Sequence, residues 1–115
     1  MFERGFLEEL VLGSYRSRLD IIADILQAAS KNAKKTHIMY QANLSYKVLK
    51  KYLRKMNEAS LIRYVCDKEC YSLTVKGRDF LDSYNEYARR SRELEERLSE
   101  VNSRKRDLEE TFLNI

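Results

Sequence analysis

Hydrophobic residues recur at helical spacing early in the chain and predict a first helix over residues 17–30. Ser17 and Asp20 form the Ser-x-x-Asp pattern of a capping box at its start. One face of this helix collects apolar side chains, namely Leu19, Ile22, Ile25, Leu26 and Ala29. Residues 2–12 also carry apolar residues at helical spacing, which indicates a short N-terminal helix or a frayed extension.

Two further helices follow. Thr36 is expected to cap a short helix over 37–42, and Asn43 is expected to form a turn. Ser45 is expected to cap a third helix that ends at about residue 59. The apolar face of the third helix holds Leu49, Tyr52, Leu53 and Met56. Its opposite face holds Lys47, Lys50, Lys51, Arg54 and Glu58, so this helix is apolar on one side and cationic on the other.

The hydrophobic period then changes from that of a helix to that of a strand. Residues 61–66 and 70–73 are rich in strand-forming residues, and the polar tip 67–69 separates them. This pattern predicts a small β-hairpin.

Thr74 is expected to cap a final helix, which carries a heptad repeat of apolar residues. The heptad positions are Phe80, Tyr84, Tyr87, Ser91, Leu94, Leu98, Val101, Lys105, Leu108, Phe112 and Ile115, and only Ser91 and Lys105 interrupt the apolar seam. A stripe of this length favours pairing with a second copy of the same helix. A parallel pair would place Lys105 beside Lys105 of the other copy, so the repeat favours an antiparallel homodimer.

The predicted fold class is mainly α with a small β-hairpin. Helix, helix, turn, helix and hairpin is the element order of a winged helix-turn-helix domain, predicted over 17–79. The coiled-coil helix is predicted over 80–115, and residues 1–16 form an N-terminal extension.

Positive charge is concentrated in the middle of a chain of 115 residues with net charge +4. Residues 31–63 hold nine Lys or Arg and one acid (9 − 1 = +8), whereas residues 80–115 hold seven basic and nine acidic residues (7 − 9 = −2). Such a cluster is typical of a surface that binds polyanions, although a solvated charged surface is the simpler alternative.

Double-stranded DNA is the predicted partner, with the third helix in the major groove. The candidate DNA-binding residues are Thr36, His37, Tyr40, Ser45, Tyr46, Lys47, Lys50, Lys51, Arg54 and Lys68. Lys68 lies between two acids at the hairpin tip, so its contribution is expected to be smaller. The alternative role for Tyr40 and Tyr46 is packing within the protein instead of phosphate contact. The alternative for His37 is an ordinary surface residue without a binding role.

Other chemistry finds little support in the sequence. No metal ligand set, cofactor or catalytic constellation is predicted, because His37 is the only histidine and no Gly-rich phosphate loop is present. Cys66 and Cys70 bracket the hairpin tip and are either free thiols or, if opposite each other, a cross-strand disulfide. No membrane contact is expected, since no apolar run approaches the length of a span, and the N-terminus does not read as a signal peptide.

Two stretches resemble a known family. Lys35-Thr-His-Ile-Met-Tyr-Gln-Ala-Asn-Leu-Ser-Tyr46 is similar to a segment of small archaeal winged-helix proteins, as are Leu61-Ile62-Arg63, Tyr71-Ser-Leu-Thr74 and Lys76-Gly77. The resemblance is to the ten-kilodalton chromatin proteins of hyperthermophilic archaea, and related regulators share the segment. It implies a homodimer joined through an antiparallel coiled coil, with a DNA-binding head at each end. The sequence departs from the family at residues 1–16 and at Gln41, where a small residue is expected.

The expected function is therefore a homodimeric, nucleoid-associated cytoplasmic DNA-binding protein, either a transcription regulator or a chromatin-architectural protein, and not an enzyme. The alternative is a coiled-coil interaction module whose winged head binds another protein.

Overall fold

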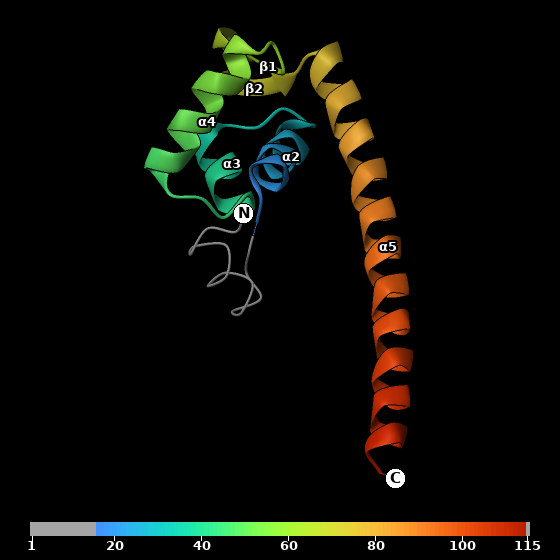
Figure 1. The fold of residues 1–115 in the computed structure, drawn as a ribbon. Coiled ribbons are helices and arrows are strands. Elements are labelled where there is room, and N and C mark those ends of the chain that lie inside the picture. Colours follow the sequence, from blue (N-terminus) through green and yellow to red (C-terminus); the bar gives the residue numbers. More distant parts are fainter. Residues whose placement is uncertain (1–15, 115) are drawn as a thin grey trace. The chain divides into compact units, whose positions relative to one another are not determined.

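The computed structural model describes residues 16–114. Figure 1 shows the elements in chain order, with short helices and a hairpin followed by one long helix. They are α2 (Arg18–Ala29), α3 (Lys35–Gln41), α4 (Tyr46–Glu58), β1 (Ile62–Val65), a 3-10 turn (Cys66–Lys68), β2 (Cys70–Leu73) and α5 (Val75–Leu113). The mainly helical winged helix-turn-helix fold predicted from the sequence is confirmed. The boundary between two compact units falls after Asp82, within α5.

Helix α2 begins with the predicted capping box. The Asp20 backbone N–H donates to Ser17 Oγ at 3.1 Å, and the Ser17 backbone N–H donates to Asp20 Oδ2 at 2.9 Å. The side chains that α2 buries are Ala23, Ile25, Leu26, Ala28 and Ala29. Leu19, which the sequence places on the apolar face of this helix, is 44% exposed. The packing of α2 is centred on its later turns, and Leu19 lies in the first turn.

Helix α3 begins two residues earlier than the sequence predicted. Its N-cap is Lys34, which makes no side-chain capping bond, so the prediction that Thr36 caps this helix is wrong. Thr36 instead lies in the first turn, because the backbone already becomes helical at Lys35. The predicted turn at Asn43 is confirmed, with a positive φ of 52° that asparagine tolerates better than most residues.

Arg16 holds the turn between α3 and α4 against α2. Its guanidinium donates to the backbone carbonyls of Ala42 at 2.6 Å and Asn43 at 3.0 Å. It also forms an ion pair with Asp24 of α2 at 2.9 Å. One side chain thereby satisfies carbonyls at the C-terminal end of α3 that the helix leaves unpaired.

Helix α4 has the two faces that its sequence predicts. Ser45 is the N-cap, and its Oγ accepts a hydrogen bond from the Val48 backbone N–H at 3.3 Å. Leu49, Leu53 and Met56 are buried, and together with residues such as Ile38 and Ile62 they form part of the hydrophobic core. This packing fixes which side of α4 remains exposed.

The hairpin pairs β1 with β2 in antiparallel register, with Tyr64 opposite Tyr71 and Val65 opposite Cys70. The cross-strand disulfide considered for Cys66 and Cys70 is therefore excluded in this structure, because Cys66 lies in the 3-10 turn and not opposite Cys70. Both thiols are free, Cys66 exposed and Cys70 buried. An isolated bridge between Ala33 and Tyr71 ties the hairpin to the segment that follows α2.

Helix α5 begins at the predicted cap. Thr74 Oγ1 accepts a hydrogen bond from the Gly77 backbone N–H at 2.9 Å, and the Thr74 hydroxyl donates to the Ser60 carbonyl. Ion pairs one turn apart support the helix further along, where Glu86 contacts Arg89 and Arg90 at 2.6 and 2.7 Å. The hydrogen bonds from these two arginines lower the pKa of Glu86.

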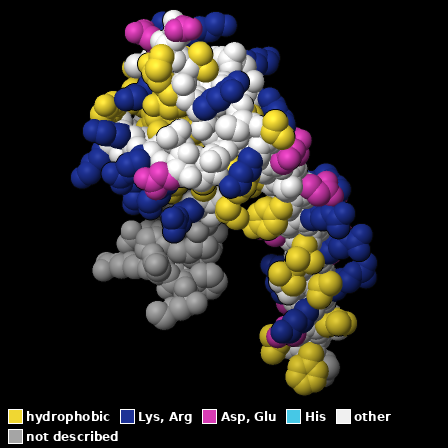
Figure 2. Space-filling model, turned by 90° about the horizontal axis from the view of Figure 1, so that it is seen from above, with side chains coloured by type: hydrophobic (Ala, Val, Ile, Leu, Met, Phe, Trp, Pro, Cys, Tyr) yellow, Lys and Arg dark blue, Asp and Glu magenta, His cyan; other side chains and the backbone are white. Residues whose placement is uncertain are grey.

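The apolar stripe of α5 is exposed over its C-terminal half, and hydrophobic side chains are visible along it in Figure 2. The exposed heptad residues are Tyr87, Leu94, Leu98, Val101, Leu108 and Phe112. Phe80 and Tyr84 are half-buried. The N-terminal segment 1–15, for which a helix was considered, and the last heptad position, Ile115, lie outside the described residues.

Candidate nucleic-acid interface

Four cations form a continuous row on the exposed face of α4. Lys47, Lys50, Lys51 and Arg54 are all exposed, and their spacing of three and four residues places them on one side of the helix. None of the ion pairs found among the described residues involves them. Lys and Arg side chains crowd one edge of the head in Figure 2, where dark blue predominates. The row therefore presents positive charge that no acid of the described chain neutralises.

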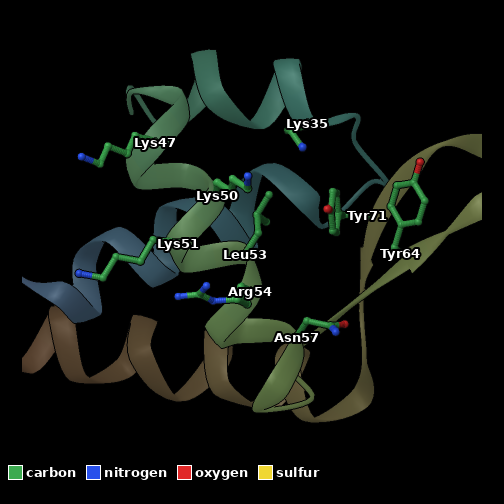
Figure 3. A pocket seen from close by; sticks show the side chains of 9 residues that line it. All are labelled: Lys35, Lys47, Lys50, Lys51, Leu53, Arg54, Asn57, Tyr64 and Tyr71. Atoms are coloured by element: carbon green, nitrogen blue, oxygen red, sulfur yellow. The ribbon is translucent and has the colours of Figure 1, made fainter.

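A groove of about 740 Å³ lies between α4 and the hairpin. Figure 3 shows the side chains that line it, which come from α3, α4 and both strands. They are Lys35, Lys47, Lys50, Lys51, Leu53, Arg54, Asn57, Tyr64 and Tyr71. None of these nine residues is acidic, and five carry a positive charge, so the groove favours an anionic ligand.

Two tyrosines form the hairpin side of this groove. Tyr64 and Tyr71 are cross-strand partners, and their ring centroids lie 5.1 Å apart at an interplanar angle of 58°. Desolvation raises the pKa of Tyr64 above its ordinary value, and the charge of Glu69 raises this pKa further. The phenol is therefore neutral at physiological pH and does not repel an anion.

A second contact joins α3 to the start of α4. Lys35 Nζ lies 5.1 Å from the centroid of the Tyr46 ring and 3.5 Å from its hydroxyl oxygen. Tyr46 is nevertheless 54% exposed. The aromatic ring holds a groove lysine in place without neutralising its charge.

The other predicted site residues lie outside the groove. Thr36, His37 and Tyr40 are exposed on α3, with Tyr40 at 79%. Ser45 is occupied as the α4 cap, and Lys68 is exposed in the 3-10 turn. The structure brings together the four cations of α4 and does not bring these five residues into the same groove.

Sequence reasoning missed five of the groove residues, Lys35, Leu53, Asn57, Tyr64 and Tyr71, as members of a site. The predicted three-residue tip at 67–69 would place Tyr64 opposite Ser72, whereas the observed four-residue connection 66–69 places Tyr64 opposite Tyr71, so the predicted hairpin did not reveal this tyrosine pair. The approach of Lys35 to this surface depends on tertiary packing and has no local signal.

Within residues 16–114, no group of three or more His, Cys, Asp or Glu side chains is placed to hold a metal ion. None of the helices in that range is both long enough and apolar enough to cross a membrane.

Comparisons with known proteins agree with this architecture. Residues 15–92 match the model of a family described as winged helix-turn-helix. The chain is 37% identical over 75 residues to the uncharacterized protein MJ0290 of Methanocaldococcus jannaschii. That match covers 64% of this chain and 35% of the relative, so the chain spans about a third of the relative's length.

A solved structure shares the fold. It is the crystal structure of Sso10a-2, a DNA-binding protein from Sulfolobus solfataricus, with a TM-score of 0.71 and 22% sequence identity. The match covers 76% of this chain and 95% of Sso10a-2. At this level of identity the likeness concerns the fold.

Proposed function

The chain belongs to the winged helix-turn-helix family, and from this premise we propose that it is a homodimeric protein that binds double-stranded DNA. Helix α4 enters the major groove, and the hairpin wing lies along the neighbouring backbone. Binding changes the accessibility of the DNA or the path that the DNA follows, and it involves no chemical step. Both effects are consistent with a transcription regulator or a chromatin-architectural protein at the nucleoid.

One observation carries this proposal. The row Lys47, Lys50, Lys51 and Arg54 is exposed, of one sign, and free of ion pairs with described acids, while the opposite side of α4 is fixed in the core. A helix of this kind fits a major groove about 12 Å wide and places its cations near phosphates and base edges. The DNA-binding description of the structurally similar Sso10a-2 supports the same reading.

The first test removes three of these charges. Replacing Lys50, Lys51 and Arg54 together by Ala is expected to lower affinity for a duplex by more than about tenfold and to flatten its salt dependence. Because log K falls with log salt at about 0.9 per phosphate contact, the loss of three contacts reduces the slope by about 2.7. Fluorescence anisotropy at several salt concentrations measures both quantities.

The matched control removes the same charge elsewhere. Arg89, Arg92 and Arg106 are exposed on α5, and changing all three to Ala lowers the net charge equally. This control is expected to keep most of the duplex affinity. Equal losses in the two triple variants would mean that net charge, and not the α4 surface, governs binding.

Unchanged affinity in the α4 variant would instead favour the rival function, a winged head that binds another protein. In that case duplex binding by the wild type would also show little dependence on salt.

The dimer forms through α5. Leu94, Leu98, Val101, Leu108 and Phe112 are between 58% and 73% exposed in the single chain. Apolar side chains at heptad spacing favour burial against a second helix. We place the two helices antiparallel, because Lys105 then faces a different residue of the partner instead of its own copy.

A further inference from the structure

The groove between α4 and the hairpin combines positive charge with an aromatic wall, and phosphate contact alone does not explain this combination. Tyr64 and Tyr71 form the wall, Leu53 lies at the base, and Lys35 and Lys50 lie on the helix side (Figure 3). We propose that this groove accepts an unpaired nucleotide of a single-stranded nucleic acid, with the base against the tyrosines and the phosphate near the two lysines. The proposal rests on the proposed nucleic-acid interface and adds a second ligand form to it.

The aromatic wall has the exposure that stacking requires. Tyr64 is 48% exposed, and its ring is tilted by 58° from that of Tyr71, so part of its surface remains open to a ligand. The cross-strand pairing fixes both rings on one face of the hairpin. Every nucleobase has a π-face, so stacking on tyrosine tolerates any sequence.

The base of the groove is apolar. Leu53 is only 4% exposed, yet it belongs to the groove lining, so it closes the space beneath the tyrosines. Asn57 lies one turn beyond Arg54 and adds an amide that can pair with the edge of a base. An apolar floor, an aromatic wall and one amide are suited to bind a nucleobase. They are not suited to bind a phosphate group alone.

The positive charge of the groove lies where the phosphate backbone of a bound single strand would run. Lys50 is exposed and Lys35 is half-buried against Tyr46, and both line the groove. Bases inside a duplex are stacked on each other and cannot reach the wall, whereas a single strand exposes base and phosphate together.

The test compares single strands with a duplex of the same length. Oligothymidylate and oligouridylate of about 12 nucleotides and a GC-rich duplex are titrated into the full chain by fluorescence anisotropy. Tyr64→Leu is expected to lower single-strand affinity by about tenfold and duplex affinity by a clearly smaller factor, because only an unpaired base reaches the ring. Tyr64→Phe, which keeps the ring, is expected to retain single-strand affinity.

A modified oligonucleotide separates stacking from charge. An abasic strand keeps the phosphates and loses the bases, so wild type is expected to bind it about tenfold more weakly than oligothymidylate. In Tyr64→Leu this difference should largely disappear. A 2-aminopurine base in the strand should lose fluorescence on binding to wild type, because stacking on an aromatic ring quenches it.

The possible outcomes distinguish single-strand binding in the groove from the proposed duplex binding. Tyr64-dependent binding of either single strand supports the inference and identifies the sugar that the groove accepts. If Tyr64→Leu leaves the single-strand affinity unchanged, or lowers the affinities for single strand and duplex equally, the inference is overturned. The proposal that the protein binds duplex DNA then still stands. Single-strand binding without any duplex binding would overturn the proposed function and keep this inference.

Discussion

Gly77 occupies a position where the fold excludes a side chain. A Cβ atom added there would overlap with the backbone carbonyl of Leu61. That carbonyl accepts a hydrogen bond from the Thr74 backbone N–H at 3.2 Å, so it is held against the start of α5. The residue before β1 and the first turn of α5 therefore share one tight contact.

Gly77→Ala is expected to lower the free energy of unfolding by about 1 kcal/mol net, since overlap with backbone atoms costs about 1–3 kcal/mol. Helix propensity acts in the opposite direction, with alanine favoured by about 1 kcal/mol in a helix interior. Urea denaturation followed by circular dichroism decides which effect is larger. Ser99→Ala, at an exposed position of α5, provides the control and should be neutral or slightly stabilising.

At the scale of single residues, local chemistry was predictable and tertiary neighbours were not. The pairing of Ser17 with Asp20 depends on a spacing of three residues, which the sequence displays directly. The exposure of Leu19 and the approach of Lys35 to the groove depend on packing between distant segments. Cys66 was misplaced because the strand ends at Val65 and the 3-10 turn begins at Cys66, the residue predicted to end the strand.

At the scale of elements, side-chain caps mark the starts of α2, α4 and α5, and α3 begins without one. Ser17 and Ser45 each accept a hydrogen bond from a backbone N–H three residues later. Helix α3 starts after Lys34 with no such bond. Sequence patterns that rely on Ser and Thr therefore place α2 and α4 correctly and place the start of α3 two residues late.

Ser17, Ser45 and Thr36 are expected to respond differently to substitution by alanine. Ser17→Ala and Ser45→Ala should each lower the free energy of unfolding by about 1 kcal/mol, since each removes a cap. Thr36→Ala should change it by less than about 0.5 kcal/mol, because Thr36 is exposed and caps nothing. Thermal unfolding of the three variants tests this ranking. A loss at Thr36 as large as at Ser45 would contradict the observed start of α3.

At the scale of the whole molecule, the winged fold was predictable because each element carries its own periodicity. Helical, strand and heptad patterns follow one another along the chain, and the order of elements then leaves few topologies. The pairing of α5 with another helix is a prediction of a different kind. The exposed stripe from Tyr87 to Phe112 indicates that a partner is needed, and the heptad positions limit how that partner is aligned.

The alignment makes the last prediction specific. In an antiparallel coiled coil, each a position of one helix shares a layer with a d position of the other. The alignment that pairs Phe80 of one helix with Phe112 of the other puts Ser91 opposite Val101 of the second copy, and Lys105 opposite Tyr87. The long stem of Lys105 then packs against an aromatic ring, and its ammonium reaches solvent beside the tyrosine hydroxyl.

Cysteine cross-linking tests this alignment. In a background with Cys66→Ser and Cys70→Ala, a mixture of Ser91→Cys and Val101→Cys chains should form a disulfide-linked dimer on oxidation. Either variant alone should link poorly, because identical positions in the antiparallel pair lie ten residues, or about 15 Å, apart along the axis. Adding Leu94→Asp to both chains should abolish the link, since a charge in the apolar seam opposes pairing. The opposite pattern, with each variant linking to itself and not to the other, would show parallel helices, and the Lys105 side chains of the two copies would then have to share one layer.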